Sequence, residues 1–392
     1  MVKKVVLILQ GGGALGAFQS GAWKALAPFI QENGYELAAV AGASIGAVNA
    51  GVIVRHCGDD DGGAGALQEL WRRAIATPPV PFLPLPGEYW RAWNGLLTGL
   101  LLGNRALFSP AYQNWNPVGD MFRFHMPMYL THNATDTMAR TVGTYRDSRP
   151  LLVVGATDVK TGEAVLFDSA RGAVTPEMFS ASLAIPLLFS PVEIDGRYYW
   201  DGEIRSNSLL PEVMALVRNT LPLEEDDDFL FIMVDMFRME WDRMPSSALQ
   251  SQYRLLNILL GGKLKYDLRA FEADNAHLQA MERLQAMAEG EARSPLTAAV
   301  EEEYRRTLAR RPAQMEFMQI GRKPFEYEHI SRDFDYSPQY IERLMQQGFE
   351  SASSAIDAYR KRTSMPEEFW LGLQGKRTSR INGLGKNMPR LM

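Results

Sequence analysis

The sequence predicts an α/β fold with a mostly parallel central sheet, and its apolar runs lead to this conclusion. Residues 5–9 form a continuous run rich in β-branched side chains, which is typical of a strand buried on both faces of a parallel sheet. Residues 37–43 form a second run, and each of the two leads through small residues into a helix-forming segment. Similar runs at 151–156 and 229–234 predict further strands, of which the second is expected to be the last in the sheet.

The composition fits a globular protein and excludes several functional classes. The chain has 392 residues, of which 46% are hydrophobic, so it can fill a sizeable core. Its net charge of -5 argues against a general nucleic-acid-binding protein. The lone cysteine, Cys57, excludes an internal disulfide framework and suits a reducing compartment. No signal peptide or membrane-spanning run is predicted, so we expect a cytoplasmic protein with peripheral contact to a membrane.

The first strand ends in a glycine-rich turn at residues 11–16, and the spacing after the turn predicts a helix over 17–30. Gly11, Gly13 and Gly16 match the dinucleotide-binding pattern G-x-G-x-x-G. That pattern also needs an acidic residue about 20 positions further on, at the end of the second strand. The second strand here ends in Ala-Gly-Ala-Ser instead, so the nucleotide interpretation of the turn lacks its acidic partner.

The second strand runs into Gly42-Ala-Ser-Ile-Gly46, a G-x-S-x-G pattern between an apolar strand and a helix. In a nucleophile elbow this pattern holds the serine, here Ser44, in a sharp and strained turn. The alternative is an ordinary turn in which Ser44 only caps the helix. The glycine-rich turn favours the elbow, because its backbone N–H groups could bind an oxyanion beside a nucleophilic serine. The candidate donors are the N–H groups of Gly11, Gly12, Gly13 and Ala14.

The glycine-rich turn, the G-x-S-x-G pattern and a later Asp-Gly pair occur in an order that resembles the patatin-like phospholipases and lipid acyl hydrolases. Residues 5 to about 207 carry the resemblance, including the stretches 155–162 and 180–186. The order is more specific than any single motif, since ordinary α/β-hydrolases generally place several strands before their elbow. The resemblance implies a patatin-like three-layer core, a serine nucleophile and an aspartate base.

Two Asp-Gly pairs compete for the role of the base. Asp195-Gly196 lies between alternating residues and suits a type I′ hairpin turn. Asp201-Gly202 ends the returning arm, where a carboxylate can be presented at the sheet edge, and it has the placement that the resemblance implies. We therefore assign the base to Asp201.

Two positions depart from the pattern that the resemblance implies. Leu15 stands where the family often has Lys or Arg, so a side chain suited to a phosphate headgroup is missing there. Glu203 stands directly after the second Asp-Gly pair, where the family more often has a small residue. An oxyanion hole made of backbone N–H groups does not depend on the side chain at position 15.

A hydrophobic insertion is expected at about 77–107. Its start, 77–87, cannot form regular structure, because its prolines remove N–H donors and fix φ. Tryptophans and leucines then recur at helical spacing. Such a helix could be a lid or a wall for an acyl chain, or it could simply pack against the core. The residues assigned to substrate binding are Trp90, Trp93, Leu97 and Pro186.

The chain is predicted to have three parts. Residues 1–238 form the catalytic α/β domain, 245–360 a helical C-terminal domain and 361–392 a basic, flexible tail. In the second part, Ser337-Pro338 starts a helix with a capping residue and a proline at the first position. Docking or dimerisation is the expected role of the helical part, and contact with an anionic bilayer is a hypothesis for the tail.

The chemistry expected from these residues is hydrolysis of a lipid carboxylic ester by a dyad of Ser44 and Asp201, without a cofactor or metal. A full triad would use His277 or His329, neither of which lies in a recognisable motif. Two different functions also stay open, a non-catalytic lipid-binding or scaffolding protein of the same fold and a nucleotide-dependent oxidoreductase. The expected partners are a lipid ester substrate (phospholipid, lysolipid or neutral lipid), a membrane surface and a second copy of the chain, but not nucleic acid.

Overall fold

The computed structural model describes most of the chain. The described residues are 2–111, 128–146, 149–206, 208–220, 228–237, 244–248, 250–264, 266–269 and 314–363. Two parts of the sequence-based predictions lie outside them, namely residues 270–313 of the expected helical domain, which include His277, and residues 364–392 of the expected tail.

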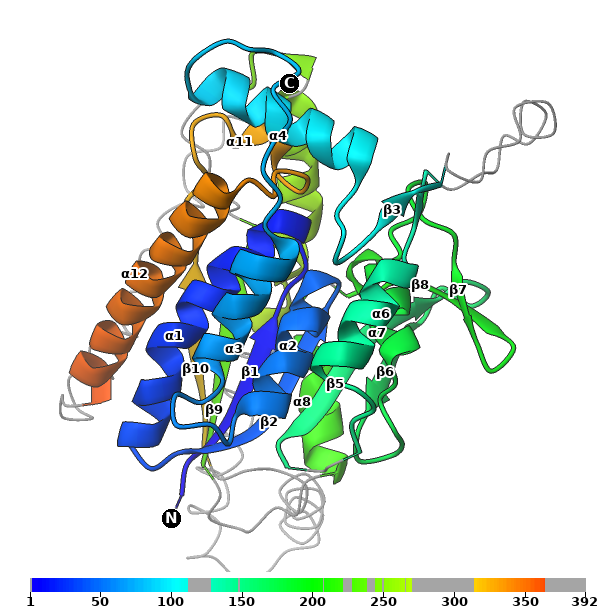
Figure 1. Ribbon diagram of the computed structural model, residues 1–392. Helices are drawn as coiled ribbons and strands as arrows, with labels where there is room; N and C mark the ends of the chain where they lie inside the picture. The colour runs from blue at the N-terminus through cyan, green and yellow to red at the C-terminus, as the bar shows by residue number, and fades with distance from the viewer. Residues whose placement is uncertain are drawn as a thin grey trace, which may run out of the picture.

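A largely parallel sheet forms the centre of the molecule (Figure 1). Its strands are β1 Lys4–Leu9, β2 Glu36–Ala43, β5 Leu151–Asp158, β6 Ala164–Asp168, β7 Val192–Ile194, β8 Arg197–Asp201, β9 Asp228–Asp235 and β10 Gln314–Gly321. They follow the order β10-β9-β1-β2-β5-β8-β7, and β6 pairs with β5 beside this path. The pairs from β10 to β5 are parallel, whereas the pairs that involve β6, β7 or β8 are antiparallel. The predicted α/β fold with a mostly parallel sheet is therefore confirmed.

Helices cover both faces of this sheet and complete a three-layer arrangement. On one face, α1 (Gly16–Glu32), α2 (Ile45–His56) and α12 (Pro338–Thr363) share a buried apolar cluster with the strands. On the other face, α8 (Leu210–Thr220) packs on a second cluster, to which Leu264 also belongs. Burial of both faces is what a parallel sheet requires.

The central strand β1 shows why its sequence is continuously apolar. Its residues alternate between the two clusters, since successive side chains of a strand point to opposite faces. Val5, Leu7 and Leu9 belong to the cluster beneath α1, and Val6 and Ile8 belong to the cluster beneath α8. Both sets are buried, as the sequence predicts for this strand.

The antiparallel edge of the sheet ends in the hairpin of β7 and β8. Asp195 and Gly196 join the two strands and have φ values of 50° and 76°. Two successive residues with positive φ are the signature of a type I′ turn. The prediction that Asp195-Gly196 forms a hairpin turn is confirmed, and β8 then delivers Asp201 to its opposite end.

Smaller elements surround this core. They are α3 Ala64–Glu69, a π-helical segment Leu70–Ile75, α6 His132–Thr141, α7 Pro176–Leu183 and the short strand pair β3 Ser109–Pro110 and β4 Tyr129–Leu130. Among the helices that the structure describes, none combines the length and the apolar character that crossing a bilayer demands.

The C-terminal part of the chain contributes to the sheet as well as to the helical layers. β10 pairs with β9 along its whole length, so the expectation that residues 229–234 form the last strand is wrong. Glu316 and Gln319 interrupt the apolar pattern of β10, which stands at the end of the described strand order. α11 (Glu328–Ser331) follows, and α12 begins at Pro338 as predicted. The predicted division of the chain into three parts stays a prediction.

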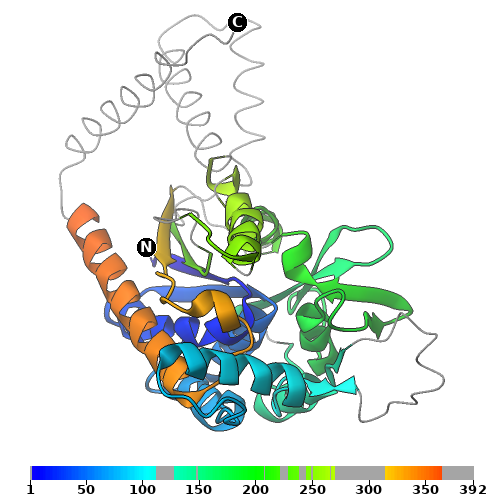
Figure 2. The same ribbon diagram turned by 90° about the horizontal axis from the view of Figure 1, so that it is seen from above.

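The hydrophobic insertion consists of an irregular stretch followed by α4 (Glu88–Leu102), which lies across the end of the molecule toward which β1 runs (Figures 1 and 2). The buried residues of α4 are Ala92, Asn94, Gly95, Thr98 and Gly99. A Cβ at Gly95 would lie 2.5 Å from Asp335 Oδ1, and one at Gly99 would lie 2.4 Å from the carbonyl oxygen of Phe334. The small residues of α4 therefore pack closely against residues 331–337, which we call the strap.

Candidate active site

Ser44 occupies the sharp turn between β2 and α2. Its backbone has φ 54° and ψ -130°, a conformation that residues other than glycine rarely adopt and that is expected for a nucleophile elbow. A Cβ at Gly42 would lie 2.2 Å from the carbonyl oxygen of Gly46, so a larger residue does not fit there. The Ser44 side chain makes no capping hydrogen bond to α2, which argues against the alternative that this serine only caps the helix.

A second serine fixes the elbow from α7. The N–H of Ser44 donates a hydrogen bond to Ser182 Oγ at 2.9 Å, and Ser182 Oγ donates to the carbonyl oxygen of Gly155 at 2.6 Å. Ser182 is fully buried. It therefore links the elbow to β5.

Asp201 ends β8 and is held mainly through its backbone. Its N–H donates to the carbonyl oxygen of Ala184 at 2.9 Å, and its own carbonyl oxygen accepts a hydrogen bond from Thr157 Oγ1 at 2.9 Å. Oδ1 accepts the N–H of Glu203 at 2.9 Å. The side chain is fully buried, and Oδ2 makes no hydrogen bond of ordinary geometry. One carboxylate oxygen is thus fixed, and the other can accept a proton.

The surroundings of Asp201 make it a stronger base than an ordinary aspartate. Burial raises its pKa to about 7, while the Glu203 N–H and the Ser44 hydroxyl, as hydrogen-bond donors to the carboxylate, lower it. The hydroxyl of Ser44 therefore faces Asp201. A base whose pKa lies near neutrality suits the transfer of a proton from serine. Among the described residues, no histidine is one of the groups that shift this pKa.

The glycine-rich turn lies against the same site. Gly12 and Gly13 have φ values of 137° and 55°, which favour glycine. Ala14 N–H donates to the carbonyl oxygen of Asp333 in the strap at 3.1 Å, so this predicted oxyanion donor is already occupied. The N–H groups of Gly12 and Gly13 have no acceptor within the described ranges. Of the four predicted donors, Gly11, Gly12 and Gly13 are open to a ligand, because the described residues offer no acceptor to the Gly11 N–H either.

A buried polar network holds the glycine-rich turn to α1 and α2. Gln19 Nε2 donates to the carbonyl oxygen of Gln10. Asn49 Nδ2 donates to the carbonyl oxygen of Gly16 at 3.0 Å and to Gln19 Oε1 at 2.7 Å, and Trp71 Nε1 donates to Asn49 Oδ1 at 2.9 Å. Sequence reasoning missed these residues because an isolated glutamine, asparagine or tryptophan belongs to no motif.

Glu203 also lies in the site. If Gly11 carried a Cβ, that atom would lie 1.8 Å from Glu203 Oε1 and 2.6 Å from Ser44 Cβ. The carboxyl group of Glu203 and the side chain of Ser44 therefore meet over Gly11. The absence of a side chain at Gly11 provides the space that these two side chains occupy, and the role of its N–H as an oxyanion donor stays a prediction.

The four predicted substrate-binding residues fall into two groups. Pro186 lies two positions after Ala184, whose carbonyl oxygen binds the Asp201 N–H. Trp90, Trp93 and Leu97 are half-buried on α4, and both tryptophans make edge contacts with Tyr89. They are not the residues through which α4 packs on the strap. Their part in substrate binding stays a prediction.

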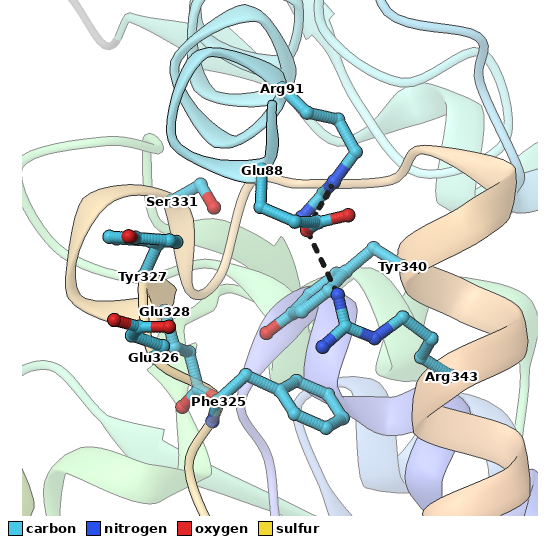
Figure 3. A pocket seen from close by; sticks show the side chains of 9 residues that line it. All are labelled: Glu88, Arg91, Phe325, Glu326, Tyr327, Glu328, Ser331, Tyr340 and Arg343. Carbon is cyan, nitrogen blue, oxygen red and sulfur yellow. Dashed lines mark hydrogen bonds and ion pairs between the residues drawn. The ribbon is translucent and has the colours of Figure 1, made fainter. Parts of the chain in front are cut away.

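A surface pocket between α4, α11 and α12 is separate from the candidate site (Figure 3). Three of its charged side chains, Glu88, Arg91 and Arg343, are paired with one another or with the strap. Arg91 binds Glu88 at 2.9 Å and Asp335 at 2.6 Å, and Arg343 binds Glu88 at 2.9 Å. None of the candidate catalytic residues lines it, and its paired charges give it a structural explanation.

Of the two histidines that could complete a triad, the structure describes one. His329 lies half-exposed on α11 and is not among the groups that shift the pKa of Asp201. His277 lies outside the described residues. In the described part of the chain, no group of three or more His, Cys, Asp or Glu residues could hold a metal ion.

Comparison with protein families finds a match over residues 7–214 to the family described as patatin-like phospholipase. No curated protein sequence matches the chain. Among solved structures, VipD from Legionella pneumophila is similar with a TM-score of 0.33 and 14% identity, over 90% of this chain and 66% of VipD. This chain thus spans just under two thirds of VipD.

The structure of the ExoU–SpcU complex, from the type III secretion system of Pseudomonas aeruginosa, is similar with a TM-score of 0.24 and 12% identity. That alignment covers 92% of this chain and 76% of the other. TM-scores as low as these carry no conclusion about function.

Proposed function

The chain belongs to the patatin-like phospholipase family, because the match covers more than half of its length, and from this premise we propose that it hydrolyses lipid carboxylic esters through a dyad of Ser44 and Asp201. Family membership supports lipid hydrolysis in general. The observation that supports the dyad is the strained Ser44, whose hydroxyl faces a buried aspartate with an unpaired Oδ2.

Acylation begins when Ser44 Oγ attacks the carbonyl carbon of the ester. The O–H bond of Ser44 breaks, its proton moves to Asp201 Oδ2, and the carbonyl oxygen takes the negative charge. When this tetrahedral intermediate collapses, the bond to the leaving alcohol breaks and Asp201 returns the proton to the alcohol oxygen. The products of this step are a free alcohol, an acyl ester on Ser44 and an ionised Asp201.

Deacylation repeats the same proton path with water. A water molecule gives a proton to Asp201 and attacks the acyl carbon, and collapse of the second intermediate returns that proton to Ser44 Oγ. A single buried carboxylate can serve both steps because its pKa of about 7 allows it both to accept and to release a proton near neutral pH.

The negative charge on the carbonyl oxygen requires donors close to Ser44. We assign this role to the N–H groups of Gly12 and Gly13, since Ala14 N–H is bonded to Asp333. A donor of this kind typically contributes about 3–4 kcal/mol to transition-state stabilisation. Two backbone donors at a turn fixed by a buried network would need little rearrangement during the reaction.

The proposed substrate class follows from the fold and from Leu15, which stands where the family often has Lys or Arg. Leu15 is fully buried in the core, so the position that could carry a cation in this family presents no charge to a headgroup. We therefore propose a lipid carboxylic ester whose binding does not depend on a phosphate at this position, which keeps phospholipid, lysolipid and neutral lipid as candidates. Membrane contact and self-association remain proposals that rest on the sequence.

The alternative functions have less support. A dinucleotide would need the N–H groups of the glycine-rich turn for its pyrophosphate, but Ala14 N–H binds the strap and a Cβ at Gly13 would lie 2.5 Å from the carbonyl oxygen of Asp333. A purely lipid-binding scaffold would have no use for a strained serine opposite a buried carboxylate.

The test compares ester hydrolysis by the wild type with that by three variants, in detergent micelles because Ser44 is only 2% exposed. We expect Ser44→Ala and Asp201→Asn each to lower kcat by at least about 10⁴-fold. Asp168→Asn is the matched control, because Asp168 is also buried, accepts a backbone N–H at Oδ1 and leaves Oδ2 without a hydrogen bond.

Activity in Asp168→Asn should equal that of the wild type, since Asp168 does not face Ser44. If Asp201→Asn keeps its activity while folded, or if Ser44→Ala hydrolyses esters as fast as the wild type, the dyad is wrong. Thermal unfolding of each variant distinguishes a chemical loss from a loss of the fold.

A further inference from the structure

The backbone of Glu203 is fixed directly behind the candidate base. Its N–H binds Asp201 Oδ1, and Lys263 Nζ donates to the carbonyl oxygens of Glu203 at 3.3 Å and of Ile204 at 2.7 Å. Lys263 lies in the helical residues 250–264, so a helix from the C-terminal part holds the turn that follows Asp201. This turn cannot move without moving the base.

The side chain of Glu203 points into the site and is not satisfied there. Glu203 is 8% exposed, and Oε1 is buried with no hydrogen-bond partner. It lies against the Cα of Gly11 and beside Ser44, where a Cβ on Gly11 would overlap it. An unpaired buried carboxyl oxygen is costly unless something else pairs with it. A bound substrate is the group that can reach this position.

The charges around Glu203 favour its neutral form. Burial raises its pKa well above the usual range, and the carboxylates of Asp201 and Asp333 raise it further. Arg332 in the strap and Lys263 lower it in part. A carboxyl group next to an ionised Asp201 is the second of the two to lose its proton, so Glu203 stays protonated while Asp201 acts as the base.

We propose that Glu203 is a further catalytic residue, whose protonated carboxyl group, lying over Gly11 beside Ser44, donates a hydrogen bond to the carbonyl oxygen of the ester that Ser44 attacks. This inference rests on the proposed hydrolase function. The hydrogen bond strengthens as the oxygen gains negative charge, and no proton leaves Glu203. A buried carboxylic acid kept neutral in an apolar site is a known way to supply such a donor.

An ionised carboxylate at this position would slow the reaction. A negative charge beside Gly11 would oppose the charge that develops on the ester oxygen, in a site where water does not screen it. Activity should therefore fall at high pH as Glu203 loses its proton, and rise from low pH as Asp201 loses its own. A bell-shaped profile of kcat/KM follows from these two groups.

The test measures kcat/KM of the wild type, Glu203→Gln and Glu203→Ala from about pH 5 to about pH 10, a range that spans both limbs of such a profile. The amide of Glu203→Gln still donates a hydrogen bond and does not ionise. We expect this variant to stay within about 5-fold of the wild type near neutral pH and to lose the alkaline limb. Glu203→Ala, which has no donor, should fall by about 10²-fold.

Glu212→Gln is the control, because Glu212 accepts a hydrogen bond from Ser206 Oγ near the same turn but lies outside the site. Its profile should match that of the wild type. The proposal is wrong if Glu203→Ala is as active as the wild type, if Glu203→Gln loses as much as Glu203→Ala, or if the alkaline limb persists in Glu203→Gln.

Thermal unfolding shows whether each variant is folded. If Glu203→Ala does not fold, the pH profile of kcat/KM for Glu203→Gln tests the proposal by itself. Failure of the hydrolase function has a different signature, because Ser44→Ala would then hydrolyse the ester as fast as the wild type. In that case the role of Glu203 fails together with the function on which it rests.

Discussion

The candidate site is held on its two sides by regions of different origin. On one side, the elbow and Asp201 lie within recognisable motifs and are fixed by short contacts from β5 and α7, such as that of Ser182 Oγ with Ser44 N–H. On the other side, the strap comes from near the opposite end of the chain and binds Ala14 through the carbonyl oxygen of Asp333. The proposed reacting groups come from the motifs, whereas the contact that holds Ala14 in the glycine-rich turn comes from the strap.

Among the ion pairs of the described residues, two deeply buried ones lie in the strap or next to it. Arg322, which directly follows β10, and Glu328, the first residue of α11, are both buried and bind each other in bidentate fashion. Arg91 of α4 binds the fully buried carboxylate of Asp335. Substitutions that disturb the strap should therefore lower both the stability of the fold and the activity. Substitutions near Asp201 should lower the activity more than the stability.

The largest effect on stability is expected from Glu328→Gln. It leaves the buried Arg322 without its charge partner, and breaking a buried ion pair in this way typically costs about 3–5 kcal/mol. Urea unfolding should show this loss, and kcat/KM measured where the variant is folded should fall because the strap no longer holds Ala14. Glu326→Gln, an exposed neighbour, is the control and should change neither quantity. Full activity in the folded Glu328→Gln protein would show that the strap does not position the turn.

The second prediction concerns the pH dependence of stability at Asp201. Burial raises its pKa from 3.8 to about 7 in the folded protein. Between these values the native state binds a proton that the unfolded chain has released, so this group lowers stability as pH rises from about 4 to about 7, by up to about 4 kcal/mol. Above pH 7 its effect is constant.

Asp201→Asn lacks this ionisation, so its stability relative to the wild type should increase over the same pH range. Urea unfolding of both proteins at several pH values measures the difference. A constant difference between the two proteins at all pH values would mean that Asp201 is not buried as described. At neutral pH the variant should therefore be more stable than the wild type but inactive. This combination is expected when a catalytic base is buried at a cost in stability.

The smallest of the three effects is expected from Ser182→Ala. Removal of the hydroxyl leaves the N–H of Ser44 and the carbonyl oxygen of Gly155 without this partner, which costs about 1–3 kcal/mol. The elbow should also lose part of its fixed geometry, so kcat should fall by more than KM changes. Ser180→Ala is a useful comparison, because Ser180 lies on the same helix and binds Thr131 and Thr135 instead. Equal kcat values for the two variants would argue against a role for Ser182 at the elbow.

The sequence was enough to predict the sharp turn at Ser44, the central strands and the Asp195-Gly196 hairpin, because their signals are local. A positive φ at Ser44, an alternating burial of β1 and a type I′ turn all follow from a few adjacent residues. The strap could not be predicted in this way. Its contact with Ala14 joins residues from opposite ends of the chain, and a backbone carbonyl such as that of Asp333 leaves no trace in the residue pattern.

α4 shows a different limit of the sequence pattern. The large side chains at helical spacing suggested the packing face, but the helix packs on the strap through small residues, among them Gly95 and Gly99. Two glycines four positions apart on one helix face are a signal of close backbone approach, and they could have indicated this face. β10 was missed because polar residues interrupt its apolar pattern.

The most direct test of the central claim is labelling of the protein with a fluorophosphonate, followed by peptide mass analysis. The reagent forms a covalent bond with an activated serine, whether or not the natural ester is known. In detergent micelles we predict a single adduct on Ser44, formed far more slowly in Asp201→Asn and at the wild-type rate in Asp168→Asn. An adduct on another serine, or equal labelling of Ser44 in Asp201→Asn and the wild type, would contradict the account.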